Sequence, residues 1–139
     1  MIVLDTNIIS ELMKGDGCHN NVYLRVSRQP LNNLYTTTIS QAEIFLGIAI
    51  LSEGKRKEKL KNLATLMFTE DFNNRILAFD EKSAISFAEI VSSRRKNGQP
   101  ISQADAQIAS ICYSNNAILA TRNVKDFIDC QITVINPFE

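Results

Sequence analysis

Apolar positions along the chain follow two alternating patterns. Short, nearly continuous apolar runs, such as residues 2–4 and 117–121, are typical of strands buried on both faces of a sheet. Between these runs, apolar residues recur every three or four positions, as at Ile8, Ile9 and Leu12, which is the spacing of an amphipathic helix. Strands that alternate with helices predict an α/β fold, an α/β/α sandwich with a mainly parallel central sheet.

The same pattern places the individual elements. Ranges rich in apolar, β-branched or aromatic residues are expected as strands: 2–4, 34–38, 75–79, 117–121 and 132–135. Ranges of helical periodicity are expected as helices: a first one between Asp5 and Gly15, then 19–28, 41–51, 55–68, 81–96 and 103–113, and a turn at 124–127. No linker, repeat or low-complexity segment divides the chain, so we expect one domain over residues 1–139.

Composition limits the class of protein. Of 139 residues, 45% are hydrophobic and 22% charged, and 15 Lys and Arg balance 15 Asp and Glu, as in a globular protein. The longest apolar run, residues 44–51, is far shorter than the roughly 20 residues of a membrane helix, and the N-terminus lacks a secretory signal. Three cysteines without a close pair favour reduced thiols. We therefore expect a cytoplasmic protein without membrane contact.

Histidine and cysteine are too scarce for several kinds of active site. A Ser-His-Asp triad would have to use His19, which is the single histidine of the chain. Zinc sites built on several His and Cys ligands have too few candidates. We expect His19 to be an ordinary polar residue in a loop or at a helix start.

Two nearly identical pentapeptides stand about sixty residues apart. Residues 39–43 read ISQAE and residues 101–105 read ISQAD. A serine followed three residues later by an acid is typical of a helix N-terminus, so Ser40 and Ser102 are candidate caps. Such a cap contributes about 1 kcal/mol. The alternative is that Glu43 and Asp105 carry a charge that catalysis requires.

Acidic side chains follow the strands at one predicted edge of the sheet. Asp5 ends the first strand, Glu43 follows the second, and Asp105 opens the helix before the fourth. Asn123 and Asp126 follow the end of the fourth strand. Sites in open parallel sheets form outside the carboxyl ends of the strands. Capping does not explain an acid directly after a buried strand, so we expect Asp5, Glu43, Asp105 and Asp126 to form a site.

Several carboxylates in one pocket repel each other and favour protonation unless a cation joins them. Oxygen ligands without sulfur or imidazole suit Mg²⁺ or Mn²⁺, which completes its shell with water and substrate phosphate. Such a metal activates water for hydrolysis of a phosphodiester. Short polar side chains beside the acids are expected to orient them from a second layer. These are Thr6, Asn7, Ser40, Thr121 and Asn123.

Basic residues are clustered although the chain has no net charge. One tract covers residues 55–61 and a second covers residues 94–96. Either tract is suited to contact a phosphate backbone, although a solvated helix face is the more common reason for such a run. The candidate RNA contacts are Lys55, Arg56, Lys57, Arg94, Arg95, Lys96 and Arg122.

Five segments carry a family resemblance over essentially the whole chain. They read VLDTN at 3–7 with IISE at 8–11, ISQAE at 39–43 with LG at 46–47, ISQAD at 101–105 with IA at 108–109, ATRN at 120–123 with DF at 126–127, and VINPF at 134–138. Any one of them occurs by chance, but all five in this order are specific. The chain resembles a PIN-domain ribonuclease, and more narrowly the VapC toxins of bacterial toxin–antitoxin pairs, including the FitB-like members.

The resemblance implies roles for particular residues. Asp5, Glu43 and Asp105 would be carboxylates of a Mg²⁺ or Mn²⁺ site. Many relatives carry a fourth acid where this chain has Asn123, and we expect Asp126 to take that part, with Asn123 as a neutral helper. The implied activity is endoribonuclease cleavage of RNA, a tRNA or ribosomal RNA. The implied partners are a small VapB-like antitoxin, whose C-terminal tail blocks the site, and a second copy in a homodimer.

Three other functions remain open from the sequence. The first is a housekeeping RNA-processing nuclease of the same fold, in place of a toxin. An aspartyl-phosphate enzyme would use Asp5 as the nucleophile, but that pattern requires a second acid where Asn7 stands. In a non-catalytic module that binds a partner protein, the carboxylates would serve only as helix caps.

Overall fold

A five-stranded, entirely parallel sheet forms the centre of the molecule. The computed structural model describes all residues 1–139. The strands are β1 (Ile2–Leu4), β2 (Leu34–Thr37), β3 (Ile76–Leu77), β4 (Ile118–Ala120) and β5 (Val134–Ile135), in the order β3-β2-β1-β4-β5. Every neighbouring pair is parallel. The strand positions and the parallel α/β sandwich predicted from the sequence are therefore confirmed, although β3 and β5 are shorter than expected.

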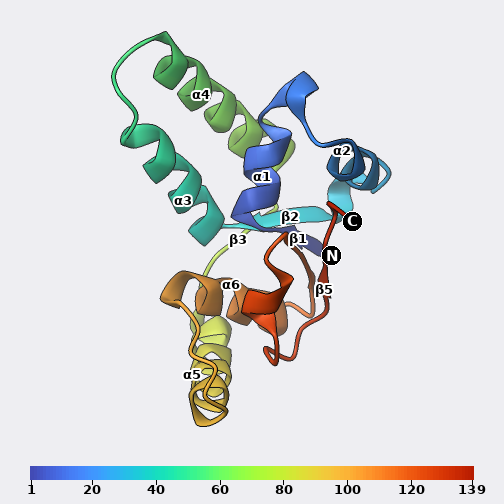
Figure 1. The fold of residues 1–139 in the computed structure, drawn as a ribbon, viewed down its shortest axis with the longest axis vertical. Coiled ribbons are helices and arrows are strands. Elements are labelled where there is room, and N and C mark those ends of the chain that lie inside the picture. The colour runs from blue at the N-terminus through green and yellow to red at the C-terminus, as the bar shows by residue number, and fades with distance from the viewer.

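Helices cover both faces of this sheet (Figure 1). The helices are α1 (Thr6–Leu12), α2 (Asn20–Ser27), α3 (Thr38–Ala49), α4 (Lys55–Leu66), α5 (Glu81–Lys96) and α6 (Gln103–Ser114). The first four lie on one side of the sheet, whereas α5 and α6 lie on the other. The pair α3 and α4 and the helix α5 extend away from the sheet in opposite directions (Figure 1).

The sheet separates two hydrophobic cores. Because successive strand residues point to opposite faces, Val3 belongs to one core and Leu4 to the other. Leu4 packs with apolar residues of α1 to α4, and Val3 packs with those of α5 and α6, such as Ile90 and Ile108. This burial on both faces explains why the strands read as continuous apolar runs. None of the helices combines the length and the hydrophobicity needed to cross a bilayer.

The start of α3 differs from the sequence prediction. Ser40 was expected to cap this helix, but the N-cap is Thr37, whose hydroxyl accepts a hydrogen bond from the Ser40 backbone N–H at 3.1 Å. The helix begins three residues earlier because β2 runs into it without a loop, and Thr37, the last strand residue, supplies a capping hydroxyl. The capping role predicted for Ser40 is therefore wrong.

The start of α6 agrees with the prediction. Ser102 is the N-cap, and its hydroxyl accepts from the Asp105 backbone N–H at 3.2 Å. Asp80 likewise caps α5, as expected, with its carboxylate accepting from the Ser83 N–H at 2.9 Å. His19 caps α2 through Nδ1, which accepts from the Asn21 N–H. All these caps satisfy N–H groups that have no partner inside the helix.

Candidate active site

Asp5 lies where β1 passes into α1, and it is 4% exposed. Its Oδ1 accepts from the Thr6 backbone N–H at 2.8 Å, so Asp5 is the N-cap of α1. Its Oδ2 accepts from the Thr121 hydroxyl at 2.7 Å and from Asn7 Nδ2 at 3.3 Å. The expectation that no cap explains Asp5 was wrong. One carboxylate oxygen caps a helix, while the other is held by a neighbouring strand end.

Thr121 connects the end of β4 to the start of α1. Its buried hydroxyl, besides donating to Asp5, accepts from Asn7 Nδ2 at 3.1 Å and from the Asn123 backbone N–H at 3.1 Å. Asn7 Oδ1 in turn accepts from the Arg122 backbone N–H at 3.0 Å. Three hydrogen bonds therefore fix the turn after β4 against the start of α1, and a fourth, from the Asn123 N–H to Thr121, lies within that turn. Asp5 is oriented by these contacts.

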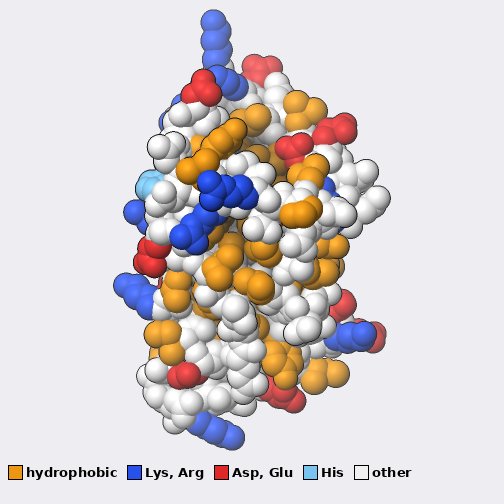
Figure 2. All heavy atoms as spheres, turned by 90° about the vertical axis from the view of Figure 1, so that its right-hand side faces the viewer, with side chains coloured by type: hydrophobic (Ala, Val, Ile, Leu, Met, Phe, Trp, Pro, Cys, Tyr) orange, Lys and Arg blue, Asp and Glu red, His pale blue; other side chains and the backbone are white.

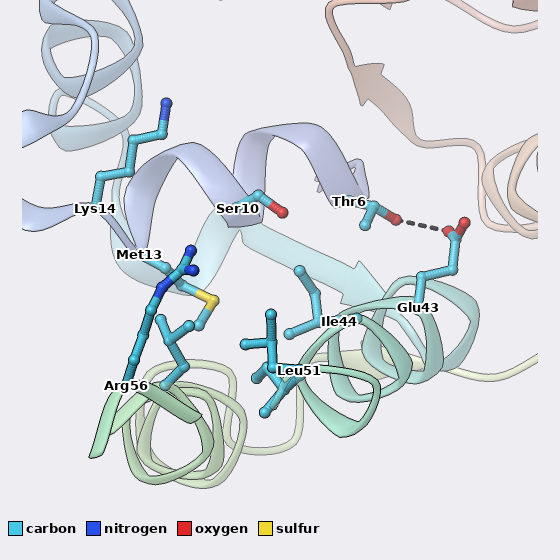
Figure 3. A pocket seen from close by; sticks show the side chains of 11 residues that line it. Thr6, Ser10, Met13, Lys14, Glu43, Ile44, Leu51 and Arg56 are labelled. Atoms are coloured by element: carbon cyan, nitrogen blue, oxygen red, sulfur yellow. Dashed lines mark hydrogen bonds between the residues drawn. The ribbon is translucent and has the colours of Figure 1, made fainter. Parts of the chain in front are cut away.

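Glu43 reaches the same edge from the second turn of α3. The Thr6 hydroxyl donates to Glu43 Oε1 at 2.7 Å and lies 2.9 Å from the Ser40 hydroxyl oxygen (Figure 3). Ser40 is fully buried, whereas Glu43 is exposed. Thr6 thus binds Asp5 through its backbone and Glu43 through its side chain, which places both carboxylates beside one residue.

Asp105 and Asp126 complete the acidic group. Asp105 lies in the first turn of α6, and Asp126 lies in the short 3-10 helix Val124–Phe127 that follows β4. Both are half-buried. Asn123 is exposed at the start of that 3-10 helix, and its side chain makes no capping hydrogen bond.

The charges of these acids act on one another. Burial raises the pKa of Asp5 above its usual value against the hydrogen bonds from Thr121 and Thr6, and the charge of Glu43 raises it further. Burial also raises the pKa of Asp105, against the bond within the Ser102 cap, and the charges of Asp5 and Asp126 add to the increase. The structure therefore brings the four predicted acids into one electrostatic group at the carboxyl edge of the sheet.

The donor chemistry of this group fits a hard divalent cation. None of the four carboxylates forms an ion pair, since the salt bridges of the molecule join Lys14 to Glu11 and Lys57 to Glu53. No three Asp, Glu, His or Cys side chains are close enough to hold one ion together. Mg²⁺ usually binds through one or two carboxylates and keeps several waters, so a partly hydrated ion does not require three carboxylates in direct contact. A bound cation would also relieve the repulsion that adds to the effect of burial on the pKa values of Asp5 and Asp105.

The predicted RNA contacts do not share one environment. Lys55, Arg56, Arg95, Lys96 and Arg122 are exposed. Lys57 is occupied, since its ammonium donates to Glu53 and to the Ala49 carbonyl at the end of α3. The guanidinium of Arg122 stacks 4.5 Å from the centre of the Phe138 ring.

Arg94 does not face solvent as the sequence prediction required, because only 5% of it is exposed. Helical periodicity explains the difference. The buried positions of α5 are Ser83, Ser86, Ile90 and Arg94, spaced by three and four residues, so Arg94 continues the core-facing side. Arg95 and Lys96 of the same run point elsewhere and are exposed. The role of Arg94 as an RNA contact is therefore wrong.

A groove that the sequence did not indicate leads away from the acids. It has a volume of about 400 Å³ and lies between α1, α3 and α4. Thr6 and Glu43 line one end, and Lys14 and Arg56 line the other (Figure 3). The residues between them are mostly apolar: Met13, Ile44, Ile48, Leu51 and Leu60. The spacing of these residues along three helices resembles ordinary core positions, which is why the sequence alone does not reveal the groove.

Two further basic residues were also missed. Arg25 of α2 and Arg28, the residue that follows α2, line a hollow of about 370 Å³ together with apolar residues of the sheet, among them Ile2 and Ile135. Figure 2 shows the face that carries α2 and the C-terminal end, where Lys and Arg side chains lie beside several hydrophobic ones. These arginines are separated in the sequence, so a search for basic runs does not find them.

Comparison with known proteins gives consistent results. The family model of the PIN domain matches residues 2–129. The plasmid stability protein StbB of Pseudomonas syringae pv. tomato is 37% identical over 100% of this chain and 99% of its own length. The VapC ribonuclease Y4jK of Sinorhizobium fredii is 32% identical, with the same coverage. The toxin FitB of Neisseria gonorrhoeae is 34% identical over 99% of each chain.

A solved structure shows the same fold. The crystal structure of FitAcB from Neisseria gonorrhoeae contains a chain that superposes with a TM-score of 0.93 at 34% identity. The match covers 100% of this chain and 99% of that chain. The agreement extends over all the elements that carry the acidic group.

Proposed function

The chain belongs to the PIN-domain family, within its VapC- and FitB-type toxins of toxin–antitoxin systems, and from this premise we propose a Mg²⁺- or Mn²⁺-dependent endoribonuclease that hydrolyses RNA phosphodiesters. We propose tRNA or ribosomal RNA as its substrate class. The observation that supports the proposal best is the group of four carboxylates without a basic partner, centred on the buried Asp5.

Each residue of the site has a proposed part. Asp5, Glu43, Asp105 and Asp126 would hold the metal ion, directly or through water. When bound, the ion supplies a water of lowered pKa and stabilises charge that develops on the phosphate. Thr121 and Asn7 hold Asp5 in one orientation, and Thr6 holds Glu43. Asn123, beside the site, is proposed as a neutral contact for RNA.

RNA must approach this acidic group although it is itself a polyanion, so nearby cations are required. Arg122 is suited to this part. Its backbone N–H binds Asn7 beside Asp5, its guanidinium is exposed, and stacking on Phe138 limits its orientation. Lys55, Arg56, Arg95 and Lys96 are proposed to contact the RNA further away. In a homodimer, these basic residues of two copies would line one groove.

The partner of the toxin is a cognate antitoxin, as the solved complexes of relatives with their antitoxins indicate. We propose that a C-terminal segment of the antitoxin occupies the groove between α1, α3 and α4. The groove is apolar along its length and begins at Thr6 and Glu43, so an occupant would also cover the acidic group. Arg56 at the other end forms no ion pair within the chain and would pair with an acidic residue of that segment, whereas Lys14 beside it is already bonded to Glu11.

The decisive experiment maps RNA 5′ ends after brief expression of the wild type and of Asp5→Asn. We expect new 5′ ends at a few sites with the wild type and none with Asp5→Asn. Asp71→Asn, the same chemical change at an exposed position far along the chain, is the control and should cleave normally. Cleavage that persists in the Asp5→Asn protein would refute the proposal.

Two further measurements separate the alternatives. Purified protein should cleave RNA in the presence of Mn²⁺, and EDTA should stop this cleavage. In cells, expression of the protein should arrest growth unless the antitoxin is co-expressed. A housekeeping nuclease would cleave without arresting growth. A module that only binds protein would show no heat of Mn²⁺ binding in calorimetry. Asp5 is poorly suited to be a phosphoryl acceptor, because it is 4% exposed and both its oxygens already accept hydrogen bonds.

A further inference from the structure

Arg94 is the one basic side chain that the fold buries. It lies in the last turn of α5 and has no carboxylate partner. Its guanidinium donates instead to four backbone carbonyls. The acceptors are Gln99 at 2.7 Å, Asp126 at 3.0 Å, Ile128 at 2.6 Å and Pro100 at 3.3 Å. Burying a charged side chain without an opposite charge beside it costs free energy, so the contacts of Arg94 need an explanation.

The four carbonyls belong to two segments that are far apart in sequence. Gln99 and Pro100 lie in the loop directly before Ser102, which caps the helix that carries Asp105. Asp126 and Ile128 lie at the end of the 3-10 helix after β4. Arg94 is therefore the side chain that ties the segment before Asp105 to the segment that contains Asp126.

We propose that Arg94 is a positioning residue of the active site, which fixes the loop before α6 and the 3-10 helix Val124–Phe127 so that Asp105 and Asp126 are held at one separation. The proposal rests on the proposed function only for its effect on catalysis. The effect of Arg94 on the two segments and on metal binding does not require that the protein cleaves RNA.

The shape of the guanidinium matters for this role. Its donors are arranged in a rigid plane, so one side chain reaches carbonyls on two segments at once. A lysine would keep the charge but offers one flexible ammonium, which does not reproduce the same set of directions. Removing the donors would leave these partly buried carbonyls without the guanidinium as a partner. We therefore expect Arg94→Lys to be nearly as harmful as Arg94→Gln.

The experiment compares Arg94→Lys and Arg94→Gln with Lys82→Arg and Lys82→Gln, which change an exposed basic residue of the same helix that has no part in the proposed site. Calorimetry with Mn²⁺ on folded protein should show about 10- to 100-fold weaker binding for both Arg94 variants, as for the loss of a group that orients a metal ligand. kcat should fall by a similar factor, with RNA affinity nearly unchanged. The Lys82 variants should keep the affinity for Mn²⁺ and kcat.

Hydrogen exchange gives a test in the unmodified protein, which covers the case that an Arg94 variant does not fold. The backbone N–H groups of residues 97–101 and 124–130 should open together, with one free energy of opening. In the Arg94→Lys protein, protection should fall in both segments and stay unchanged in α1 and α3.

Three results would overturn the proposal. The first is an Arg94→Lys protein with the Mn²⁺ affinity of the wild type, because charge alone would then suffice. The second is independent exchange of the two segments in the wild type. The third is loss of RNA affinity with kcat and Mn²⁺ binding intact. If the wild type binds Mn²⁺ but cleaves no RNA, the proposed function fails, while the calorimetry and the exchange still test Arg94.

Discussion

Residues 39–43 and 101–105 differ in one letter but occupy different places in their helices. In ISQAD, Ser102 is the N-cap of α6 and Asp105 lies in the first turn. In ISQAE, Ser40 lies inside α3, which Thr37 caps three residues earlier, and Glu43 lies in the second turn. The two serines also differ, since Ser40 is fully buried while Ser102 is exposed. Nearly the same sequence thus caps one helix and forms part of the interior of another.

The different positions suit the different acids. Asp105 is close to the helix start, in the first turn of α6 and three residues after the Ser102 cap. Glu43 is three residues further into its helix, and its longer side chain reaches back to the Thr6 hydroxyl at 2.7 Å. The comparison shows that a motif alone does not fix a role. The residues before the motif decide where the helix begins. The position of the acid in the helix then sets how long its side chain must be to reach the site.

The largest expected effect comes from removing each acid's charge. Glu43→Gln and Asp105→Asn should each lower kcat for RNA cleavage by more than about 100-fold, since loss of a group that only orients a metal ligand already costs 10- to 100-fold. Both variants should keep the far-UV circular dichroism of the wild type. Normal cleavage by either variant would mean that its pentapeptide serves the fold alone, and the two regions would then differ in function as well as in position.

Exchanging the two acids tests whether side-chain length is matched to position. Glu43→Asp removes one methylene and should lose the contact to Thr6, and Asp105→Glu should push a longer side chain into a half-buried place. A misplacement of about 1 Å can cost up to about 100-fold in rate, so we expect kcat to fall by 10- to 100-fold. Single-turnover cleavage at saturating Mn²⁺ measures this. Unchanged rates in both variants would show that charge matters there and length does not.

Glycine at the two serines should separate their structural roles. A helix cap tolerates glycine within a few tenths of a kcal/mol, whereas a helix interior loses about 1 kcal/mol. Ser102→Gly should therefore leave the midpoint of thermal unfolding nearly unchanged. Ser40→Gly should lower it by about 3 to 5 °C. Thr37→Ala, which removes the true cap of α3, should also cost about 1 kcal/mol. Equal effects of glycine at Ser40 and Ser102 would contradict the difference in helix position.

The parallel sheet could be predicted from the sequence because it depends on local patterns. Continuous apolar runs mark strands buried on both faces, and Asp5 could be placed at a strand end because Ile2–Leu4 stops there. The cap at Ser102 was also predictable, since the residue before it, Ile101, has no capping side chain. The cap of α3 was ambiguous in sequence, because Thr37 and Ser40 are both good capping residues.

The rest of the site depends on contacts between distant segments. Thr6 and Glu43 are 37 residues apart, and Thr121 and Asp5 are 116 apart. No local pattern determines how α3 packs against α1, so the sequence could name these residues but not pair them. Arg94 is a different case. Residues 94–96 were interpreted as one basic run, without regard to the direction in which each side chain leaves the helix. Arg94 follows Ile90 by four residues, and this spacing places it on the buried face of α5.

The smallest expected effect concerns stability and pH in the absence of metal. Because burial raises the pKa of Asp105, the folded protein binds this proton more tightly than the unfolded chain does. Stability is therefore lost as pH rises from the ordinary pKa of an aspartate, 3.8, through the raised pKa of Asp105, and the loss is complete above it. Asp105→Asn removes this loss, so in EDTA it should unfold at a higher temperature than the wild type at neutral pH.

The gain should stay below the cap effect of about 1 kcal/mol, because Asp105 is only half-buried and solvent screens its charge. It should disappear below about pH 3.8, where the carboxyl is protonated in both states. Glu43→Gln is the matched control. Glu43 is exposed, so removing its charge removes little of the free energy that burying a charge costs. Thermal unfolding of the three proteins between about pH 3 and pH 7 measures the difference. If Glu43→Gln gained as much stability as Asp105→Asn, burial could not be what distinguishes the two acids.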